Sequence, residues 1–220
     1  MISLTVDNRE LKVEEGKSVL QACLENSIFI PNMCFIKTRE HPHASCRLCF
    51  VEIDSSDKPV ASCTERVREG LVVRTDTEPV RRLQRTAFKL LMSAHHCTPK
   101  VCPVKGGCQL IRTAKYLEVG LNPRPLELLE REVEEEVDLN IFIYYPFRCV
   151  LCGKCIYVCR QRNEQNPLTF AKRGFDTVIA FLGRDPADYP CHQCGACAAV
   201  CPTGALVLKS EYSKTATANR

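Results

Sequence analysis

Two copies of one cysteine run constrain the C-terminal part of this chain more than any other feature of its sequence. The copies are Cys149-Val-Leu-Cys152-Gly-Lys-Cys155-Ile-Tyr-Val-Cys159 and Cys191-His-Gln-Cys194-Gly-Ala-Cys197-Ala-Ala-Val-Cys201. Each has the spacing C-x2-C-x2-C-x3-C, in which three thiolates of one loop bind one [4Fe-4S] cubane and the fourth binds a second cubane. We therefore predict one cluster on Cys149, Cys152, Cys155 and Cys201, and another on Cys159, Cys191, Cys194 and Cys197. Two structural zinc sites are the alternative. Zinc is held by four ligands, however, and zinc binding would not account for the regular third and fourth cysteines of each run.

The composition is unusual in its cysteine content, with 16 cysteines among 220 residues. Met1 leads into an alternating stretch without a charged and then apolar segment, so we expect no secretory signal. The longest apolar runs are too short to span a bilayer. A cysteine-rich chain of this kind is expected in a reducing, cytoplasmic compartment, where thiols hold metal rather than form disulfides. The net charge of +4 comes from scattered basic residues and argues against nucleic-acid binding.

The N-terminal segment predicts a small sheet with one helix. Residues 2–6 and 11–13 alternate apolar and polar side chains around a break at 7–9, which is typical of a β-hairpin. Ser18 and Gln21 have the spacing of a capping box at the start of a helix that runs to about Asn26. Cys23 lies on the apolar face of that helix, and we interpret it as a small buried hydrophobic residue.

Four further cysteines follow, in the pattern Cys34-x11-Cys46-x2-Cys49-x13-Cys63. Three thiols on one loop and a fourth on a neighbouring segment are typical of a plant-type [2Fe-2S] site, although the first gap is longer than in chloroplast ferredoxins. The hairpin, the helix, the loop and the strands expected near 50–53 and 71–73 match the β-grasp fold of such ferredoxins. His41 and His43 lie in the loop, but four cysteines are present, so we interpret both as ordinary loop residues.

A helix is expected from Thr77-Glu78-Pro79 onward, with its arginines on a solvated surface or a subunit contact. Its predicted apolar face consists of Val80, Leu83, Ala87, Leu90, Leu91 and Ala94. The helix leads into a segment that holds His95, His96, Cys97, Cys102 and Cys108. Three cysteines and two histidines this close together predict a metal site. The spacing alone leaves an iron-sulfur cluster and a Cys3His zinc site both open.

We therefore predict an α+β chain of five parts. They are a [2Fe-2S] ferredoxin domain (1–77), a helical His/Cys domain (78–117), an acidic and partly helical connector (118–140), a 2×[4Fe-4S] ferredoxin domain (141–209) and a flexible tail (210–220). Within the fourth part, strands are expected at 174–181 and 205–208. His192 is expected to tune a cluster by hydrogen bonding rather than to bind iron.

The order of these sites resembles the N-terminal iron-sulfur portion of the large peripheral-arm subunit of respiratory complex I, and still more the small diaphorase subunit of NAD-reducing hydrogenases. The resemblance covers nearly the whole chain and rests on residues 44–53, 72–77, 148–155, 174–177 and 191–206. It implies that the middle motif binds a third [4Fe-4S] cluster through the pattern H-x3-C-x2-C-x5-C. His95, Cys102 and Cys108 are in that register, but Pro99 stands at the first cysteine position. We predict that Cys97, two residues early, ligates instead, with His95 as the fourth ligand and His96 as its rival.

No glycine-rich phosphate loop and no candidate flavin or nicotinamide site is visible in the sequence. One [2Fe-2S] and three [4Fe-4S] clusters without a substrate site predict a non-catalytic electron-transfer subunit of an oxidoreductase complex, such as a hydrogenase or a formate dehydrogenase. The expected partners are a flavin/NAD(P)-binding diaphorase subunit and a separate catalytic oxidoreductase subunit. A freely diffusing polyferredoxin and a redox-sensing regulatory protein are the alternatives.

Overall fold

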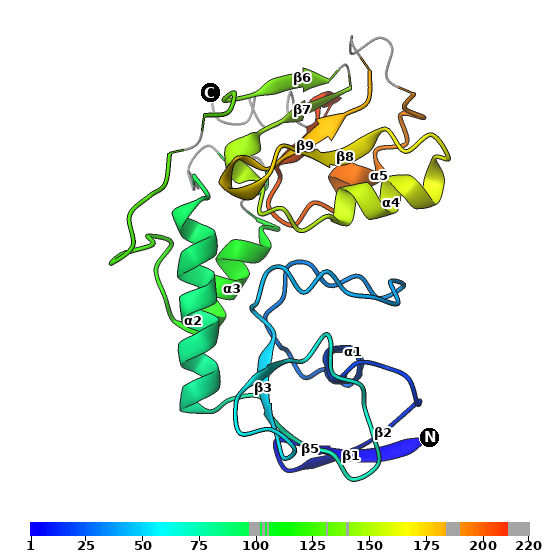
Figure 1. Ribbon diagram of the computed structural model, residues 1–220, viewed down its shortest axis with the longest axis vertical. Helices are drawn as coiled ribbons and strands as arrows, with labels where there is room; N and C mark the ends of the chain where they lie inside the picture. The colour runs from blue at the N-terminus through cyan, green and yellow to red at the C-terminus, as the bar shows by residue number, and fades with distance from the viewer. Residues whose placement is uncertain are drawn as a thin grey trace. The chain divides into compact units, whose positions relative to one another are not determined.

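The chain forms two compact units in the computed structural model (Figure 1). The structure describes residues 1–96, 102, 104, 106–130, 132–139, 141–183 and 190–210, so the predicted ligand Cys97 and nearly all of the predicted tail lie outside the described residues. Unit 1 comprises Met1–Leu90 and Thr113–Gly120, and unit 2 comprises Leu91–Arg112 and Leu121–Arg220. Two of the three boundaries fall inside helices α2 (Glu78–Ser93) and α3 (Gln109–Leu117), and the third follows Gly120.

Unit 1 contains a five-stranded sheet in the order β2-β1-β5-β3-β4. Its strands are β1 (Ile2–Val6), β2 (Arg9–Val13), β3 (Phe50–Ile53), β4 (Val60–Ala61) and β5 (Val72–Arg74). β1 and β2 pair antiparallel, which confirms the predicted hairpin, and Asp7 and Asn8 form its tight turn with φ of 46° and 66°. β1 also pairs parallel to β5. The alternation of β1 and β2 directs Leu4, Val6 and Leu11 into the core.

Helix α1 (Val19–Glu25) begins at Ser18, whose hydroxyl accepts a hydrogen bond from the Gln21 backbone N–H (3.2 Å). Only this half of the predicted capping box forms. Gln21 Nε2 donates to Glu25 Oε1 (3.1 Å), one turn along the helix. Cys23 is fully buried, as predicted, and burial raises the pKa of its thiol to about 12.

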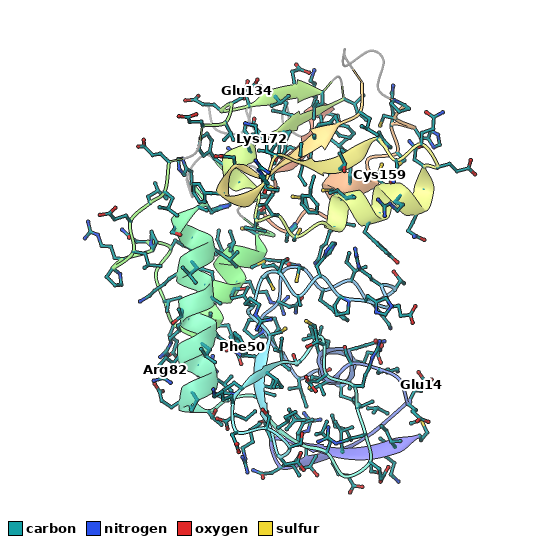
Figure 2. All side chains as sticks on the ribbon, in the orientation of Figure 1. Glu14, Phe50, Arg82, Glu134, Cys159 and Lys172 are labelled. Carbon is teal, nitrogen blue, oxygen red and sulfur yellow. The ribbon has the colours of Figure 1, made fainter. Side chains whose placement is uncertain are left out.

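The buried face of α2 agrees with the predicted one at Val80 and Ala87 but differs from it at other positions. Its buried residues include Gln84, Phe88 and Met92, whereas Leu90 is 56% exposed. Gln84 Nε2 donates to the backbone oxygen of Phe50 on β3 (3.0 Å; Phe50 is labelled in Figure 2). The predicted stripe counted only apolar side chains, so it left out a glutamine that lies inward to satisfy a strand carbonyl.

The arginines of α2 were predicted to lie on a solvated surface or in a subunit contact, and two of them also form hydrogen bonds within the chain that the prediction did not include. Arg81 Nη1 donates to the backbone oxygen of Tyr116 (3.1 Å), and Arg85 Nε donates to that of Leu117 (3.0 Å). The Arg81 guanidinium also lies over the Tyr116 ring, 4.2 Å from its centroid. Both cations therefore satisfy the last carbonyls of α3, where a helix leaves acceptors unpaired and carries partial negative charge.

Unit 2 contains a three-stranded antiparallel sheet, a two-stranded hairpin and two short helices. The sheet has the order β10-β7-β6, formed by β6 (Val137–Leu139), β7 (Phe142–Tyr144) and β10 (Leu206–Leu208). The hairpin joins β8 (Leu168–Ala171) and β9 (Val178–Phe181), and the helices are α4 (Lys154–Arg162) and α5 (Ala196–Ala199). Short 3-10 turns cover η1 (Pro146–Arg148) and η2 (Gly174–Asp176). Side chains of both sheets and several cysteines share one core.

Two details of the predicted C-terminal elements were wrong. The strand predicted at 174–181 begins only at Val178, because Ala171 pairs with Val178 and the residues between them form the hairpin turn. The connector predicted at 118–140 contains no helix among its described residues, and Val137–Leu139 is a strand of the sheet. Prolines 123 and 125 and the adjacent like charges of the glutamates disfavour a helix there. The strand predicted near 205–208 is confirmed by β10.

Candidate metal centres

The four N-terminal cysteines come together in unit 1. Cys34, Cys46, Cys49 and Cys63 are each between 2% and 5% exposed. They form two pairs, because Cys34 Sγ lies 3.5 Å from Cys46 Sγ and the Cys49 and Cys63 side chains are hydrogen-bonded to each other. Two thiolates on one tetrahedral iron stand about 3.7 Å apart when the metal–sulfur bonds are about 2.3 Å. The arrangement therefore fits a [2Fe-2S] cluster with one cysteine pair on each iron.

Backbone donors surround these thiols. The Met33 N–H donates to Cys46 Sγ (3.4 Å), and the left-handed residues Ala44 (φ 50°) and Arg47 (φ 52°) bend the loop around the site. The side-chain hydrogen bond between Cys34 and Cys46 lowers the pKa of Cys34 to about 5, and the one between Cys49 and Cys63 lowers that of Cys49 to about 7. Each pair thus holds one thiol with marked thiolate character, which is the form that binds iron.

The two loop histidines lie among other partners. His43 Nε2 is 2.7 Å from Arg39 Nη1, and His41 Nε2 is 4.0 Å from a Glu40 oxygen at an exposed position. Both arrangements are those of loop side chains, in line with the interpretation from the sequence.

The two C-terminal cysteine runs have the same local backbone. Leu151 (φ 50°) and Gly153 (φ 72°) are left-handed in the first run, and Gln193 (φ 52°) and Gly195 (φ 69°) are left-handed in the second. Helices α4 and α5 begin directly after these glycines. Each loop therefore wraps its cysteines around the N-terminus of a helix, where unpaired N–H groups and the helix dipole favour negative charge.

The fourth cysteine of each run lies with the other run. Burial chiefly raises the pKa of Cys152 to about 12, and the nearby charges of Cys201 and Cys149 add to the effect. One cavity is lined by Cys149, Cys152, Cys155 and Cys201, together with residues that include Tyr144 and Ile179. The grouping is the one that the spacing predicts for the first cubane.

The second set is more open to solvent. Cys159, on α4 (labelled in Figure 2), lies near Cys191 and Cys194. Burial chiefly raises the pKa of Cys197 to about 12, and Cys159, Cys191 and Cys194 add to the effect. Cys194 is exposed. His192 is exposed as well, and it is the Gln193 backbone N–H that donates to Cys191 Sγ (3.3 Å).

Tyr144 contacts the first set, and sequence reasoning missed it. Its hydroxyl accepts a hydrogen bond from the Ile179 backbone N–H (3.2 Å) and is hydrogen-bonded to the Cys149 side chain. Burial first, and then the charge of Cys149, raises the pKa of this hydroxyl well above its usual value. The sequence alone places Tyr144 only in an apolar extended piece. The signal that could have found it is the period-two spacing of Phe142 and Tyr144, which puts both on the inner face of one strand.

The middle motif is only partly described. His95 is 5% exposed, its Nδ1 has no hydrogen-bond partner among the described residues, and burial lowers its pKa to about 4. His96 Nε2 is likewise buried without a partner in the described part of the chain, and its ring stacks on Phe147 with 4.3 Å between centroids. A neutral imidazole with an unpaired nitrogen can bind iron, so both histidines fit the role. Cys102 lies near Cys108, but no interaction among the described residues joins these thiols to either histidine.

In the described part of the chain, no three His, Cys, Asp or Glu side chains come close enough to hold a single metal ion. An iron-sulfur cluster needs a looser grouping, because each iron of a [2Fe-2S] cluster takes two thiolates and each iron of a cubane takes one. Over the same residues, none of the helices has the length and apolar character required to cross a membrane.

Comparison with known proteins identifies an iron-sulfur domain in the N-terminal and in the C-terminal cysteine-rich part of the chain. Residues 1–78 match the family described as 2Fe-2S iron-sulfur cluster binding domain, and residues 148–205 match the 4Fe-4S dicluster domain. Over 95% of its length the chain is 31% identical to the NADPH-Fe(3+) oxidoreductase subunit alpha of Geobacter sulfurreducens. Over 94% it is 30% identical to an NADH-quinone oxidoreductase subunit of Rhizobium meliloti. The chain spans 24% of the length of each of these two relatives.

A solved structure shares the fold. The chain superposes with a TM-score of 0.83 and 25% identity on a chain of the NAD+-reducing [NiFe]-hydrogenase in the H2-reduced state, covering 95% of this chain and 88% of that one. The resemblance inferred from the motifs is thereby confirmed. The chain is a homologue of an NADH-quinone oxidoreductase subunit and of an NAD+-reducing hydrogenase chain, and it carries a 2Fe-2S cluster binding domain followed by a 4Fe-4S dicluster domain.

Proposed function

We propose that this chain is the iron-sulfur relay of a multi-subunit oxidoreductase. It would carry electrons between a flavin/NAD(P)-binding subunit and a separate catalytic subunit. The observation that carries the proposal is the grouping of Cys201 with Cys149, Cys152 and Cys155, and of Cys159 with the second run. This exchange would place two one-electron carriers next to each other in one domain, which supports a relay.

The proposed cofactors are one [2Fe-2S] and three [4Fe-4S] clusters, which supply one-electron acceptance and donation when bound. The proposed ligands are Cys34, Cys46, Cys49 and Cys63 for the [2Fe-2S] cluster; His95, Cys97, Cys102 and Cys108 for the middle cubane; and the two C-terminal sets described above. His95 and not His96 is proposed because its ring is the more deeply buried of the two.

The protein's own residues bind the clusters, exclude water and place N–H groups against sulfur. The N-terminal thiols and Cys152, Cys155 and Cys197 are between 2% and 8% exposed, so water has little access to these ligands. The Ala205 N–H donates to Cys201 Sγ (3.2 Å), as the Gln193 N–H does to Cys191. Such donors stabilise the added negative charge of a reduced cluster, and they tune its potential.

The names of the relatives support the proposed partners, and the cysteines support the proposed compartment. One relative is named as an NADPH-Fe(3+) oxidoreductase subunit, and the solved structure is an NAD+-reducing hydrogenase. A diaphorase subunit and a catalytic oxidoreductase subunit are therefore the proposed partners. None of the fifteen described cysteines forms a disulfide, which supports a reducing, cytoplasmic location.

Anaerobic purification of the native complex through a tag on this chain tests the proposal. We expect a flavin-containing subunit to accompany the chain and the visible iron-sulfur absorbance to bleach when NADH or NADPH is added. The isolated chain should bleach with dithionite but not with either nucleotide. A chain that elutes from native lysate as a free monomer, or one that NAD(P)H reduces without another subunit, would contradict the relay.

A further inference from the structure

We infer that the Tyr144 hydroxyl raises the reduction potential of the cluster proposed for Cys149, Cys152, Cys155 and Cys201, by donating a hydrogen bond to Cys149 Sγ. The inference rests on the proposed function, because it requires that this cluster is present. It assigns to Tyr144 a tuning role that is separate from binding iron.

The position of Tyr144 is fixed from several sides. It lies on β7, the central strand of its sheet, opposite Val137 on β6 and Leu206 on β10. Its side chain is 2% exposed. The ring meets Phe181 edge to face, with 5.9 Å between centroids and 63° between planes. A side chain held in this way cannot turn its hydroxyl to another partner.

The two hydrogen bonds of the hydroxyl determine its direction. The Ile179 backbone N–H donates to the tyrosine oxygen (3.2 Å), so that oxygen already serves as an acceptor. The hydroxyl proton is then available for the second bond, which goes to the Cys149 side chain. Because a cluster-bound cysteine is a thiolate and can only accept, Tyr144 must be the donor in the loaded protein.

Tyr144 also separates the cluster cavity from a second cavity. Tyr144 and Ile179 line the space around the four thiols, and both also line a second pocket, whose lining includes Val137 and Phe181 but also the charged side chains Glu132, Glu134 and Lys172. The hydrogen bond to Cys149 is nevertheless shielded from water, because Tyr144 is 2% exposed and Ile179 is 4% exposed. A low local dielectric strengthens such a bond relative to one in water.

The effect on the potential follows from charge. Reduction adds one electron from the reductant to the cubane, taking [4Fe-4S]2+ to [4Fe-4S]1+, and no proton moves because tyrosine keeps its own. The thiolate sulfurs become more negative, so a donor to one of them stabilises the reduced state more than the oxidised state. Removing the donor should lower the potential.

A second hydroxyl near this site shows why Tyr144 is singled out. Thr203 Oγ1 lies 4.0 Å from Cys201 Sγ, but its proton is donated to the Arg148 backbone oxygen (2.6 Å). It therefore has no proton to give the thiolate. Tyr144 differs because its other hydrogen bond is one that it accepts.

The test compares Tyr144→Phe with Tyr145→Phe in the full chain, purified anaerobically. The second variant is the matched control and removes the hydroxyl of the next residue, Tyr145. The centroid of its ring lies 3.9 Å from the guanidinium carbon of Arg148. Iron and acid-labile sulfide are measured first, and dithionite titration followed by electron paramagnetic resonance then gives the potentials. For Tyr144→Phe we expect the reduction equilibrium constant of one [4Fe-4S] couple to fall about tenfold, which is about 59 mV for one electron. The reduction potentials of the other clusters, and of all clusters in Tyr145→Phe, should not change.

Proton resonance at the cluster gives a second, independent reading. Electron-nuclear double resonance of the reduced parent should show an exchangeable proton at this cubane that disappears in Tyr144→Phe. Full iron with unmoved potentials, or an equal shift of all cubanes, would overturn the tuning role alone. Loss of about four irons in Tyr144→Phe would also overturn it, because the hydroxyl would then be structural. A parent chain without iron would overturn the proposed function together with the inference.

Discussion

The exchange of Cys159 and Cys201 between the two C-terminal runs can be tested by two double substitutions. Cys149→Ala/Cys201→Ala removes two thiols that line one cavity, whereas Cys149→Ala/Cys159→Ala removes two thiols of the same run. If the proposed grouping is correct, the first variant leaves one site with two thiolates and the other site with all four. The second variant leaves each site with three.

The expected magnitudes follow from this count of ligands. A site with two thiolates does not hold a cubane, so the first variant should lose about four of about 14 irons per chain and keep the other cubane intact. In the second variant neither site has its full ligand set. Both cubane signals of this pair should then be altered together, either lost or converted to a cluster with fewer irons.

Iron analysis and electron paramagnetic resonance on anaerobically purified protein provide the assay. Cys23→Ala is a matched control, because Cys23 is also buried but lies in the apolar core of unit 1. It should retain all of its iron. The reasoning would be refuted if the outcomes were exchanged, with one intact cubane in Cys149→Ala/Cys159→Ala and two damaged sites in Cys149→Ala/Cys201→Ala.

Two further predictions concern stability. Phe88→Ala should lower the free energy of unfolding by about 3–5 kcal/mol, because its ring is fully buried. Leu90→Ala on the same helix should lower it by less than about 0.5 kcal/mol. Urea unfolding of the two variants measures the difference, and equal losses would contradict the observed helix face. Hydrogen bonds from Lys17, Lys37 and Gln21 lower the pKa of Glu25 to about 2. The stabilisation from Glu25 is therefore complete above its unfolded pKa of about 4.3 and is lost as the pH falls toward 2. The difference in urea midpoint between the parent and Glu25→Gln should shrink over that range. A difference that stays constant with pH would contradict this prediction.

The sequence allowed the cluster sites to be predicted better than the packing around them. Cysteine spacing is local, so the loops around Cys152 and Cys194 follow from a few adjacent residues and two glycines. The exchange of Cys159 and Cys201 could be predicted because the same pattern occurs twice. The hairpin of β1 and β2 was equally accessible, since its alternation and its turn are both short-range signals.

The residues that were missed depend on contacts distant in sequence. Gln84 is buried because it reaches the Phe50 carbonyl on another element, and no helical periodicity contains that information. Arg81 and Arg85 satisfy the end of a helix that follows about thirty residues later in the chain. Tyr144 approaches Cys149 only after β7 has paired with β6 and β10. Secondary-structure propensity and hydrophobic pattern depend on residues close together in the sequence. The roles of these side chains depend instead on contacts between distant elements of the fold.

The middle motif shows a different limit. The spacing of His95, Cys102 and Cys108 matches the resembling family, but Cys97 departs from it and lies outside the described residues. The structure adds that a ring nitrogen of His95 and one of His96 are buried and have no hydrogen-bond partner among the residues that it describes. They identify two candidate nitrogen ligands, and a comparison of His95→Ala with His96→Ala for the loss of one cubane would decide between them.

Metal and sulfide analysis of the anaerobically purified full chain tests the central claim most directly. The account predicts a brown protein with about 14 iron atoms and about 14 acid-labile sulfides per chain, from one [2Fe-2S] and three [4Fe-4S] clusters. A colourless chain that contains zinc and no sulfide would contradict it.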